Sequence, residues 1–175
     1  MQNDTLPVKI LTDVAQSGGL LWERIANFKE HLSSLPGALT HKAGEPQSEG
    51  LKEHAPLKHH FEGGLYTREL SLSKGSLLIS MIHKQEHPSF LLKGKVSYIG
   101  HDGEVYTVSA PYTVFTQIGA QRIIYAHEDT IWTCVYKTDA TTVEEAELEV
   151  YADEYRELGE ELIMKIQEKC QEQLH

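Results

Sequence analysis

The chain has 175 residues, of which 40% are hydrophobic and 24% are charged, as expected for one soluble globular domain with its own core. Its formal net charge of -10 argues against a nucleic-acid polymer or an anionic membrane as a main partner, because both require clustered Lys and Arg. The sequence shows neither a long apolar run nor a basic, apolar leader, so we expect no membrane span and a cytoplasmic location.

Residues 1–56 are predicted to form an N-terminal helix followed by an irregular loop. Within 11–34, apolar residues recur at spacings of three and four, which indicates an amphipathic helix with a regular part beginning near Gly19 or Leu20. Residues 36–58 are rich in Gly, Pro, His and charge and have no period, so we expect a mobile loop there. Whether this loop forms a lid over a site is left open.

Residues 57–140 are predicted to form a β-barrel. Seven short segments rich in β-branched and aromatic residues alternate with turn signals: LYTREL, SLLISMI, SFLLKGKVSYI, EVYTVSA, YTVFTQI, RIIYAH and TIWTCVYK. The Asp-Gly pair that begins at Asp102 favours a tight hairpin. Many short strands at such intervals are typical of an all-β sandwich or barrel.

Residues 141–175 are predicted to form an acidic C-terminal helix, which completes a single structural domain. The helix is expected within 143–172, with its exposed Glu face, including the carboxylates of EAELEV, in solvent. Its apolar stripe would consist of Tyr151, Tyr155, Leu158, Leu162 and Ile166. Cys134 and Cys170 have neither metal nor redox spacing, so both are expected to be reduced packing residues.

Two sets of residues in the β region have the spacing of a small-molecule site. Gly75, Met81, His83, His87 and Gly94 are spaced as in the first motif of cupin proteins, which this stretch resembles. That motif has two histidines, a glutamate and a glycine. Here Met81 replaces the first histidine and His87 replaces the glutamate.

The second set runs from Pro111 through Gln117 and Gly119 to Arg122, and it resembles the second cupin motif. Arg122 replaces the histidine of that motif. A guanidinium has no lone pair for a cation, but its planar donors match a carboxylate or a phosphate. We therefore expect Arg122 to face a small anion, to which His83 and His87 could also donate hydrogen bonds.

A divalent metal is the alternative, because two neighbouring neutral imidazoles can ligate Fe, Mn, Zn or Ni. Met81 and His83 should share one strand face, and His87 should begin the next strand close to His83. A third ligand would require Tyr125, His127 or Tyr136 to turn inward. Simple alternation from Arg122 sends Tyr125 and His127 to the opposite face.

Each candidate also has a purely structural interpretation. His83 and His87 are then strand-end residues with ordinary hydrogen bonds. Arg122 then forms a buried ion pair with Glu69 or Glu128. The neighbouring histidines of the loop are expected to be irregular and exposed: His54, His59 and His60.

Four segments resemble a group of small cupin-like proteins of tailed bacteriophages and prophages: HHFEGGLYTREL, KGSLLISMIHKQEH, LLKGKVSYIGHDGEVYTVSAPYTVF and GAQRIIYAHEDTIWTCVY. The resemblance covers about Leu57 to Thr138 and implies a double-stranded β-helix, or jelly roll, with no established reaction. The matching positions are Tyr66, Arg68, His83, Gly94, Pro111, Arg122, Glu128, Asp129 and Trp132. Tyr136 departs from the pattern, since relatives often have a histidine there, and this weakens a metal site.

Two classes of function follow, and they leave open whether the protein is an enzyme. In the first, a binding module holds a small anionic metabolite or nucleotide, to sequester or sense a host molecule, with His83, His87, Arg122, Tyr66 and Tyr136 as ligand-binding residues. In the second, a metal-dependent oxygenase or isomerase uses His83 and His87, or a histidine acts as general base without metal. A structural or assembly component is a third hypothesis. The resemblance further implies a homodimer or higher homo-oligomer in the host cytoplasm.

Overall fold

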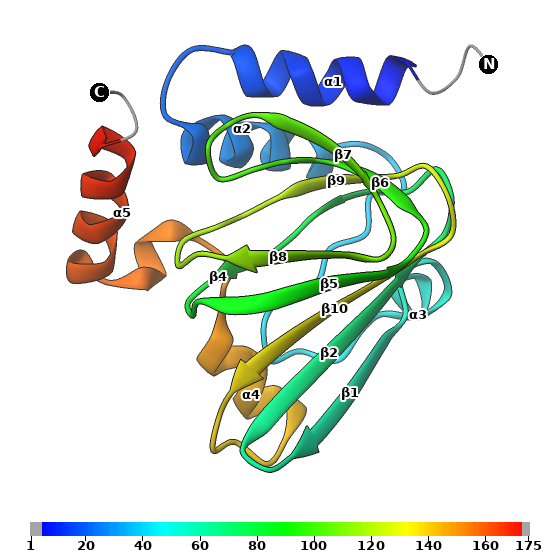
Figure 1. Ribbon diagram of the computed structural model, residues 1–175, viewed down its shortest axis with the longest axis vertical. Helices are drawn as coiled ribbons and strands as arrows, with labels where there is room; N and C mark the ends of the chain where they lie inside the picture. The colour runs from blue at the N-terminus through cyan, green and yellow to red at the C-terminus, as the bar shows by residue number, and fades with distance from the viewer. Residues whose placement is uncertain (1–4, 173–175) are drawn as a thin grey trace.

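The computed structural model describes the backbone of residues 5–172. The strands between residues 57 and 137, apart from the short β4 (Ile82–His83), form two antiparallel sheets (Figure 1). The five-stranded sheet has the order β1 (Leu57–Glu62), β2 (Leu65–Leu72), β10 (Thr130–Lys137), β5 (His87–Lys93) and β8 (Tyr112–Thr116). The four-stranded sheet has the order β3 (Leu77–Ile79), β9 (Ile123–Ala126), β6 (Lys95–Ile99) and β7 (Val105–Ser109). From β2 onward the chain passes repeatedly from one sheet to the other.

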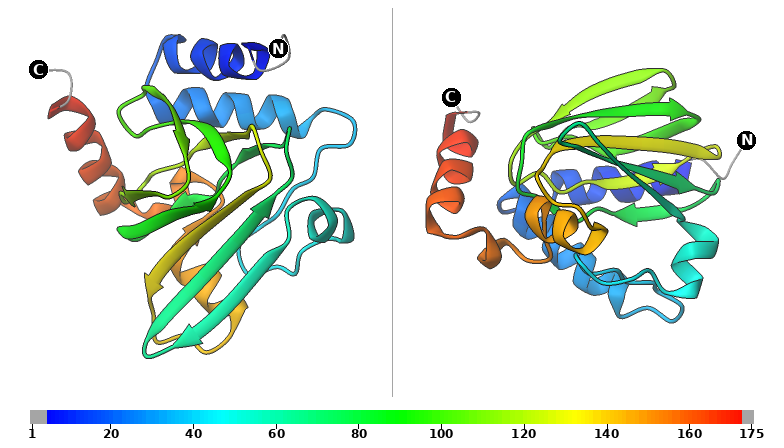
Figure 2. Two further views of the ribbon diagram at one scale, coloured as in Figure 1. Left: turned by 45° about the vertical axis from the view of Figure 1, so that its right-hand side comes forward. Right: turned by 90° about the horizontal axis from the view of Figure 1, so that it is seen from below.

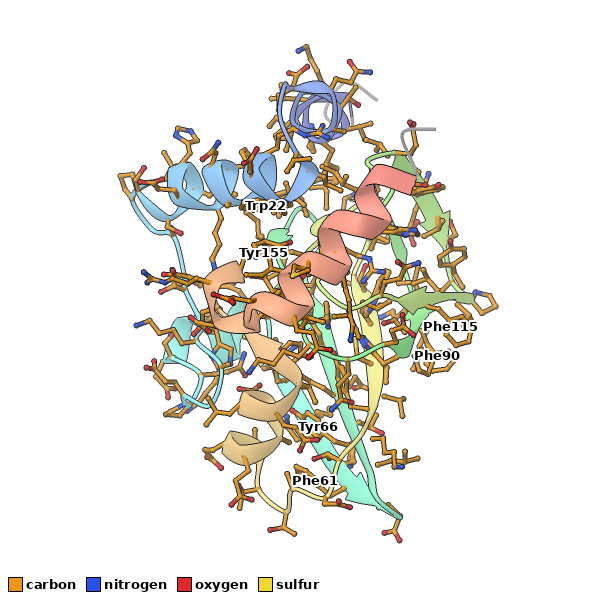
Figure 3. The ribbon with its side chains drawn as sticks, turned by 90° about the vertical axis from the view of Figure 1, so that its left-hand side faces the viewer. Trp22, Phe61, Tyr66, Phe90, Phe115 and Tyr155 are labelled. Atoms are coloured by element: carbon orange, nitrogen blue, oxygen red, sulfur yellow. The ribbon has the colours of Figure 1, made fainter. Side chains whose placement is uncertain are left out.

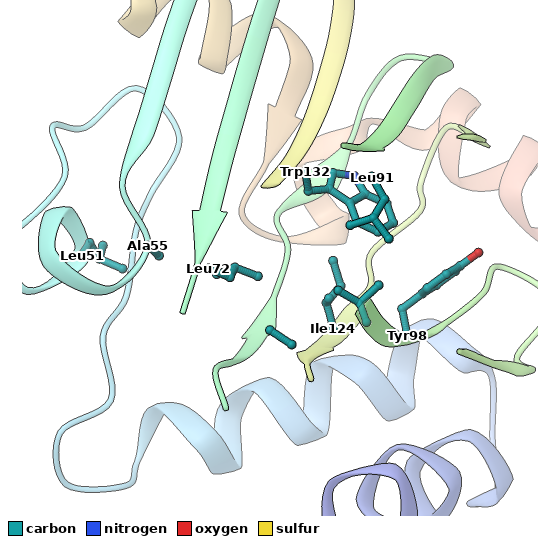
Figure 4. Close-up of a cluster of buried hydrophobic side chains, with 9 residues drawn as sticks. Leu51, Ala55, Leu72, Leu91, Tyr98, Ile124 and Trp132 are labelled. Carbon is teal, nitrogen blue, oxygen red and sulfur yellow. The ribbon is translucent and has the colours of Figure 1, made fainter. Parts of the chain in front are cut away.

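The core lies between the two sheets and is supplied by both of them. Leu91 and Trp132 from the five-stranded sheet pack in one cluster with Tyr98 and Ile124 from the four-stranded sheet (Figure 4). Along β5, inward residues alternate with outward ones, as the period of two in its sequence predicts. Burying each large apolar side chain in this layer contributes roughly 1.5–3 kcal/mol.

Two helices cover the outer face of the four-stranded sheet (Figure 2). They are α1 (Thr5–Gln16) and α2 (Leu21–Ser33). Leu11 and Ile25 from these helices are buried against Ile99 and Ile123. The start of α2 agrees with the apolar period, but that period does not predict α1 as a separate helix. The part of the chain that the structure describes has no helix long and apolar enough to cross a membrane.

The segment 36–58 is more regular than its composition suggested, because it contains α3 (Glu49–His54) and the start of β1. The side chain of Ser48 accepts a hydrogen bond from the Leu51 backbone N–H and caps α3. Leu51 and Ala55 are buried in the core cluster between the sheets, which anchors this short helix (Figure 4). The expectation of a wholly irregular segment is therefore wrong.

The prediction of one C-terminal helix over 143–172 is also wrong. The chain forms α4 (Val143–Val150), β11 (Tyr151–Ala152), a 3₁₀ helix η1 (Tyr155–Leu158) and α5 (Glu160–Glu172). The break occurs because β11 pairs with β4 (Ile82–His83). The Tyr155 ring of η1 then lies 5.2 Å from the Trp22 ring of α2, which ties this region to the N-terminal helices (Figure 3).

Candidate functional site

A cavity of about 90 Å³ lies between the sheets and beneath the segment 36–58. Residues from this segment supply part of the wall: His41, Gln47, Leu51, Ala55 and Leu57. The polar wall from the rest of the chain consists of Arg68, Ser80, His83, Arg122, Cys134 and Tyr151. The other lining residues are apolar: Leu70, Leu78, Ile79, Met81, Ile124 and Trp132. The segment thus covers the cavity, but neither His54 nor His59 is among the lining residues.

Arg122 lies in the wall of this cavity and is 4% exposed. Its Nη1 donates a 2.9 Å hydrogen bond to Thr116 Oγ1, and its guanidinium carbon lies 5.7 Å from the centre of the Tyr98 ring. Its Nε has no hydrogen-bond partner among the described residues. A buried donor without a partner is costly, so this nitrogen favours a ligand that can accept a hydrogen bond.

The backbone around Arg122 fixes the direction of its side chain. The Arg122 N–H donates to Ser80 Oγ at 2.9 Å, and the Ser80 N–H donates to the Arg122 carbonyl at 2.9 Å. Arg122 immediately precedes β9, and Ile124, two residues further on, lines the same cavity. The alternation of strand side chains therefore directs both residues inward.

Arg122 forms no ion pair with any carboxylate among the described residues. The alternative of a pair with Glu69 or Glu128 is wrong, and Glu69 instead lies 3.0 Å from Lys58 Nζ. Burial lowers the pKa of Arg122. Because a guanidinium stays protonated in proteins, its charge in the cavity wall is unbalanced.

Arg68, by contrast, has a buried counter-charge. Its Nε donates to Glu147 Oε1 at 3.2 Å, and Glu147 is 1% exposed. The other carboxylate oxygen lies 3.2 Å from His41 Nε2 and 3.2 Å from the Gly44 N–H. Burial alone would raise the pKa of Glu147, but the His41 hydrogen bond and the Arg68 charge lower it overall. The expectation that the carboxylates of EAELEV are all in solvent is therefore wrong for Glu147.

His83, Tyr136 and Tyr151 form a buried hydrogen-bonded chain. His83 Nδ1 lies 3.0 Å from Tyr136 Oη, which lies 2.7 Å from Tyr151 Oη. His83 and Tyr151 line the cavity, whereas Tyr136 lies behind them. The structure therefore places Tyr136 next to His83, although the two residues are 53 positions apart.

His87 begins β5, and its ring lies 4.7 Å from the His83 ring and 4.1 Å from the Tyr136 ring. Its Nδ1 donates to the Gln85 carbonyl at 3.0 Å, and its Nε2 has no hydrogen-bond partner among the described residues. His87 is buried but does not line the cavity. It therefore supports His83 and Tyr136 from behind.

Both histidines are neutral at pH 7. Burial lowers the pKa of His87 to about 4. Burial also lowers the pKa of His83 far below its usual value, with further contributions from His87, Arg122 and Arg68. Among the described residues that line the cavity, Arg122 is consequently the one charged group without a counter-charge.

Three other candidates lie away from the cavity wall. Tyr66 is fully buried, bonded through its hydroxyl to His59 Nδ1 at 2.7 Å, and packs with residues of α4. Tyr125 packs on the opposite face in the cluster beneath α1 and α2, and His127 Nε2 lies 2.7 Å from Ser97 Oγ. Strand alternation thus explains why Tyr125 and His127 do not reach the cavity.

The residues present do not fit a metal centre. Among the described side chains, which are those of residues 6–166, no group of three or more His, Cys, Asp or Glu residues could hold a metal ion. Arg122 also contributes a positive charge to the cavity that His83 lines, and this charge repels a cation. Cys134 is a free cysteine in the cavity wall, and the prediction for Cys170 lies outside the described side chains.

Neither the family models nor the curated proteins that were compared match this sequence. Similar solved structures include ectoine synthase from P. lautus, with 11% identity over 70% of this chain and 84% of that chain, at a TM-score of 0.46. A cupin 2 domain-containing protein from Halorhodospira halophila has 16% identity over 56% of this chain and 72% of that chain, at a TM-score of 0.44. An acetylacetone dioxygenase from Acinetobacter johnsonii has 17% identity over 59% and 79%, at a TM-score of 0.40. At these levels of similarity, none of them assigns an activity, and the phage origin stays a prediction.

Proposed function

We propose that this protein is a binding module that holds a small monocarboxylate in the cavity, with Arg122 as its anchor. One observation carries the proposal: Arg122 is 4% exposed, has no carboxylate partner among the described residues, and has an Nε without an acceptor. A carboxylate supplies both the missing charge and the missing acceptor in one planar group.

The charge balance of the wall favours one negative charge over several. Arg68 is neutralised by Glu147, and His83 and His87 are neutral at pH 7. A phosphate or a nucleotide would therefore bring more negative charge than Arg122 alone can balance. The cavity of about 90 Å³ also favours a small head group over a nucleotide.

The hydrogen bonds of Tyr136 and Tyr151 can set the tautomer of His83, so that its ring becomes a second hydrogen-bond donor for the same ligand. If Tyr151 donates to Tyr136 and Tyr136 donates to His83 Nδ1, the proton of His83 is on Nε2. That N–H can donate to one carboxylate oxygen while Arg122 donates to the other. His83 then acts as a neutral donor, which its low pKa permits.

The arrangement of the strands supports a cupin-like double-stranded β-helix as the scaffold. Without β1, the sheets read β2-β10-β5-β8 and β3-β9-β6-β7. Apart from the short β4 and the β6–β7 hairpin, successive strands alternate between the two sheets, as in jelly rolls. Sites in such folds lie inside the barrel, where this cavity also lies. The described residues offer no set of three ligands for a metal-dependent reaction.

The test is a ligand-observed NMR titration with butanoate and with butanamide, its neutral analogue. We expect butanoate to bind and butanamide to bind at least about tenfold more weakly, because a charged hydrogen-bonded pair is lost. Arg122→Met should abolish butanoate binding. Arg156→Met is the matched control, since the Arg156 side chain is 81% exposed and is absent from the cavity wall. Equal binding of butanoate by wild type and Arg122→Met would overturn the proposal.

A further inference from the structure

We propose that the natural ligand is an amphiphile: a monocarboxylate with an unbranched hydrocarbon chain, whose tail leaves the cavity and lies in a neighbouring apolar groove. This inference rests on the proposed function, since Arg122 would hold the carboxylate. It adds the chemical class of the rest of the ligand and a second binding surface on α2 and the segment that follows it.

The cavity alone is too small for a larger metabolite. Its volume is about 90 Å³. An apolar cavity of about 150 Å³ accommodates a single benzene molecule. A ligand whose carboxylate reaches Arg122 therefore has only a short part of its body inside the cavity, and any longer body must extend beyond it.

A groove of about 340 Å³ adjoins the cavity. Four residues line both hollows and form the partition between them: His41, Leu51, Leu78 and Ile79. Three of these four side chains are apolar. The hydrocarbon tail of a ligand that leaves the cavity past this partition would therefore contact apolar side chains on both sides of it.

The groove has an apolar floor that is unusually exposed. Leu35 and Leu39 line it and are 44% and 46% exposed. Leu32, Pro36 and Leu77 line the same groove, and Lys29 is the one Lys, Arg, Asp or Glu residue in its wall among the described residues. Exposed leucines that gather in a hollow favour an apolar occupant, because covering them removes hydrocarbon surface from water.

The partition is held by contacts that a ligand can rearrange. His41 comes from an irregular part of the chain, and its Nε2 lies 3.2 Å from Glu147. Glu147 keeps two other donors, Arg68 and the Gly44 N–H, when His41 moves aside. The Glu147 carboxylate therefore keeps hydrogen-bond donors while the hydrocarbon tail of the ligand passes between His41 and Leu51.

The test is isothermal titration calorimetry with butanoate, hexanoate and decanoate, and with decanol as the uncharged analogue. Each methylene that the groove buries should tighten binding by up to about fourfold, so decanoate should bind at least about tenfold more tightly than butanoate. Leu35→Asn should weaken decanoate at least about threefold and leave butanoate within about twofold. Leu92→Asn is the matched control, because Leu92 is 55% exposed and lies on β5, outside the groove.

The outcomes separate this inference from the proposed function. Equal affinities for butanoate and decanoate would overturn the amphiphile and leave the carboxylate site intact. Decanoate affinity that Leu35→Asn and Leu92→Asn reduce equally would overturn the groove. Decanol binding as tightly as decanoate, or no binding of any acid, would overturn both proposals, since Arg122 would then not hold the carboxylate.

Discussion

Replacing His87 by Asn should make the protein less sensitive to acid. His87 is 2% exposed, and burial lowers its pKa from 6.5 to about 4. The folded protein therefore resists protonation of this ring, while the unfolded chain takes up the proton near pH 6.5. For a group with a lowered histidine pKa, stability is fully present above pH 6.5 and is lost as the pH falls from 6.5 towards 4.

The size of the effect follows from the two pKa values. Between pH 7 and pH 5, protonation of the unfolded chain at this one site should cost the folded state about 2 kcal/mol. The His87→Asn variant cannot lose this contribution, and its side-chain amide can still donate to the Gln85 carbonyl, as His87 Nδ1 does at 3.0 Å. The free energy of unfolding of the variant should therefore fall by about 2 kcal/mol less than that of the wild type over the same range.

The assay is urea denaturation followed by tyrosine and tryptophan fluorescence at pH 7, 6 and 5. The comparison uses the change with pH within each protein, so a packing defect in the variant at pH 7 does not affect it. His60→Asn is the control for the same exchange of side chains, because His60 is exposed on β1 and lies outside the buried cluster around His87. Identical losses of stability in wild type and His87→Asn would refute a buried, neutral His87.

The remaining predictions concern the polar core and the backbone. Glu147→Gln should lower the free energy of unfolding by roughly 3–5 kcal/mol, because it leaves a buried guanidinium without its counter-charge. Glu144→Gln, on the exposed side of the same helix, should cost under about 1 kcal/mol, and similar urea midpoints for the two variants would contradict this. Gly94→Ala should destabilise by at least about 2 kcal/mol more than Gly75→Ala: both glycines have φ near +90°, but only at Gly94 would a Cβ lie 2.6 Å from the Asp129 carbonyl oxygen. Equal thermal midpoints for these two variants would show that the close approach has no cost.

The β region was predictable from local signals. Its short strands follow from alternating apolar residues and from turn signals, and both are properties of neighbouring residues. The alternation in SFLLKGKVSYI predicts one strand, but the segment divides into β5 and β6 at Gly94, where the backbone has a φ of +89°. The inward direction of Arg122 follows from the same alternation, as does the outward direction of Tyr125.

The rest of the site depends on contacts between distant residues. The 3.6-residue period across 143–172 favours one helix, and nothing local predicts that Tyr151 would leave it to pair with His83. The break places Tyr151 in the cavity wall, and α4, which ends just before it, places Glu147 next to Arg68. A glutamate in an acidic helix resembles its solvated neighbours until the partner strand is known. In the structure, Ala146 and Glu147 are buried while Leu148 and Glu149 are exposed, and no local property of the sequence indicates this division.

The two arginines of the cavity wall differ in whether the fold supplies a counter-charge, and this difference has an evolutionary consequence. The charge of Arg68 is balanced by Glu147, whereas Arg122 has no counter-charge among the described residues and, under the proposed function, would receive one from a bound carboxylate. If the proposed function holds, a single substitution at position 122 would change the preference of the cavity from anionic to neutral ligands and leave the strands unchanged. A substitution at position 68 would be destabilising, because it would remove the counter-charge of the buried Glu147 carboxylate.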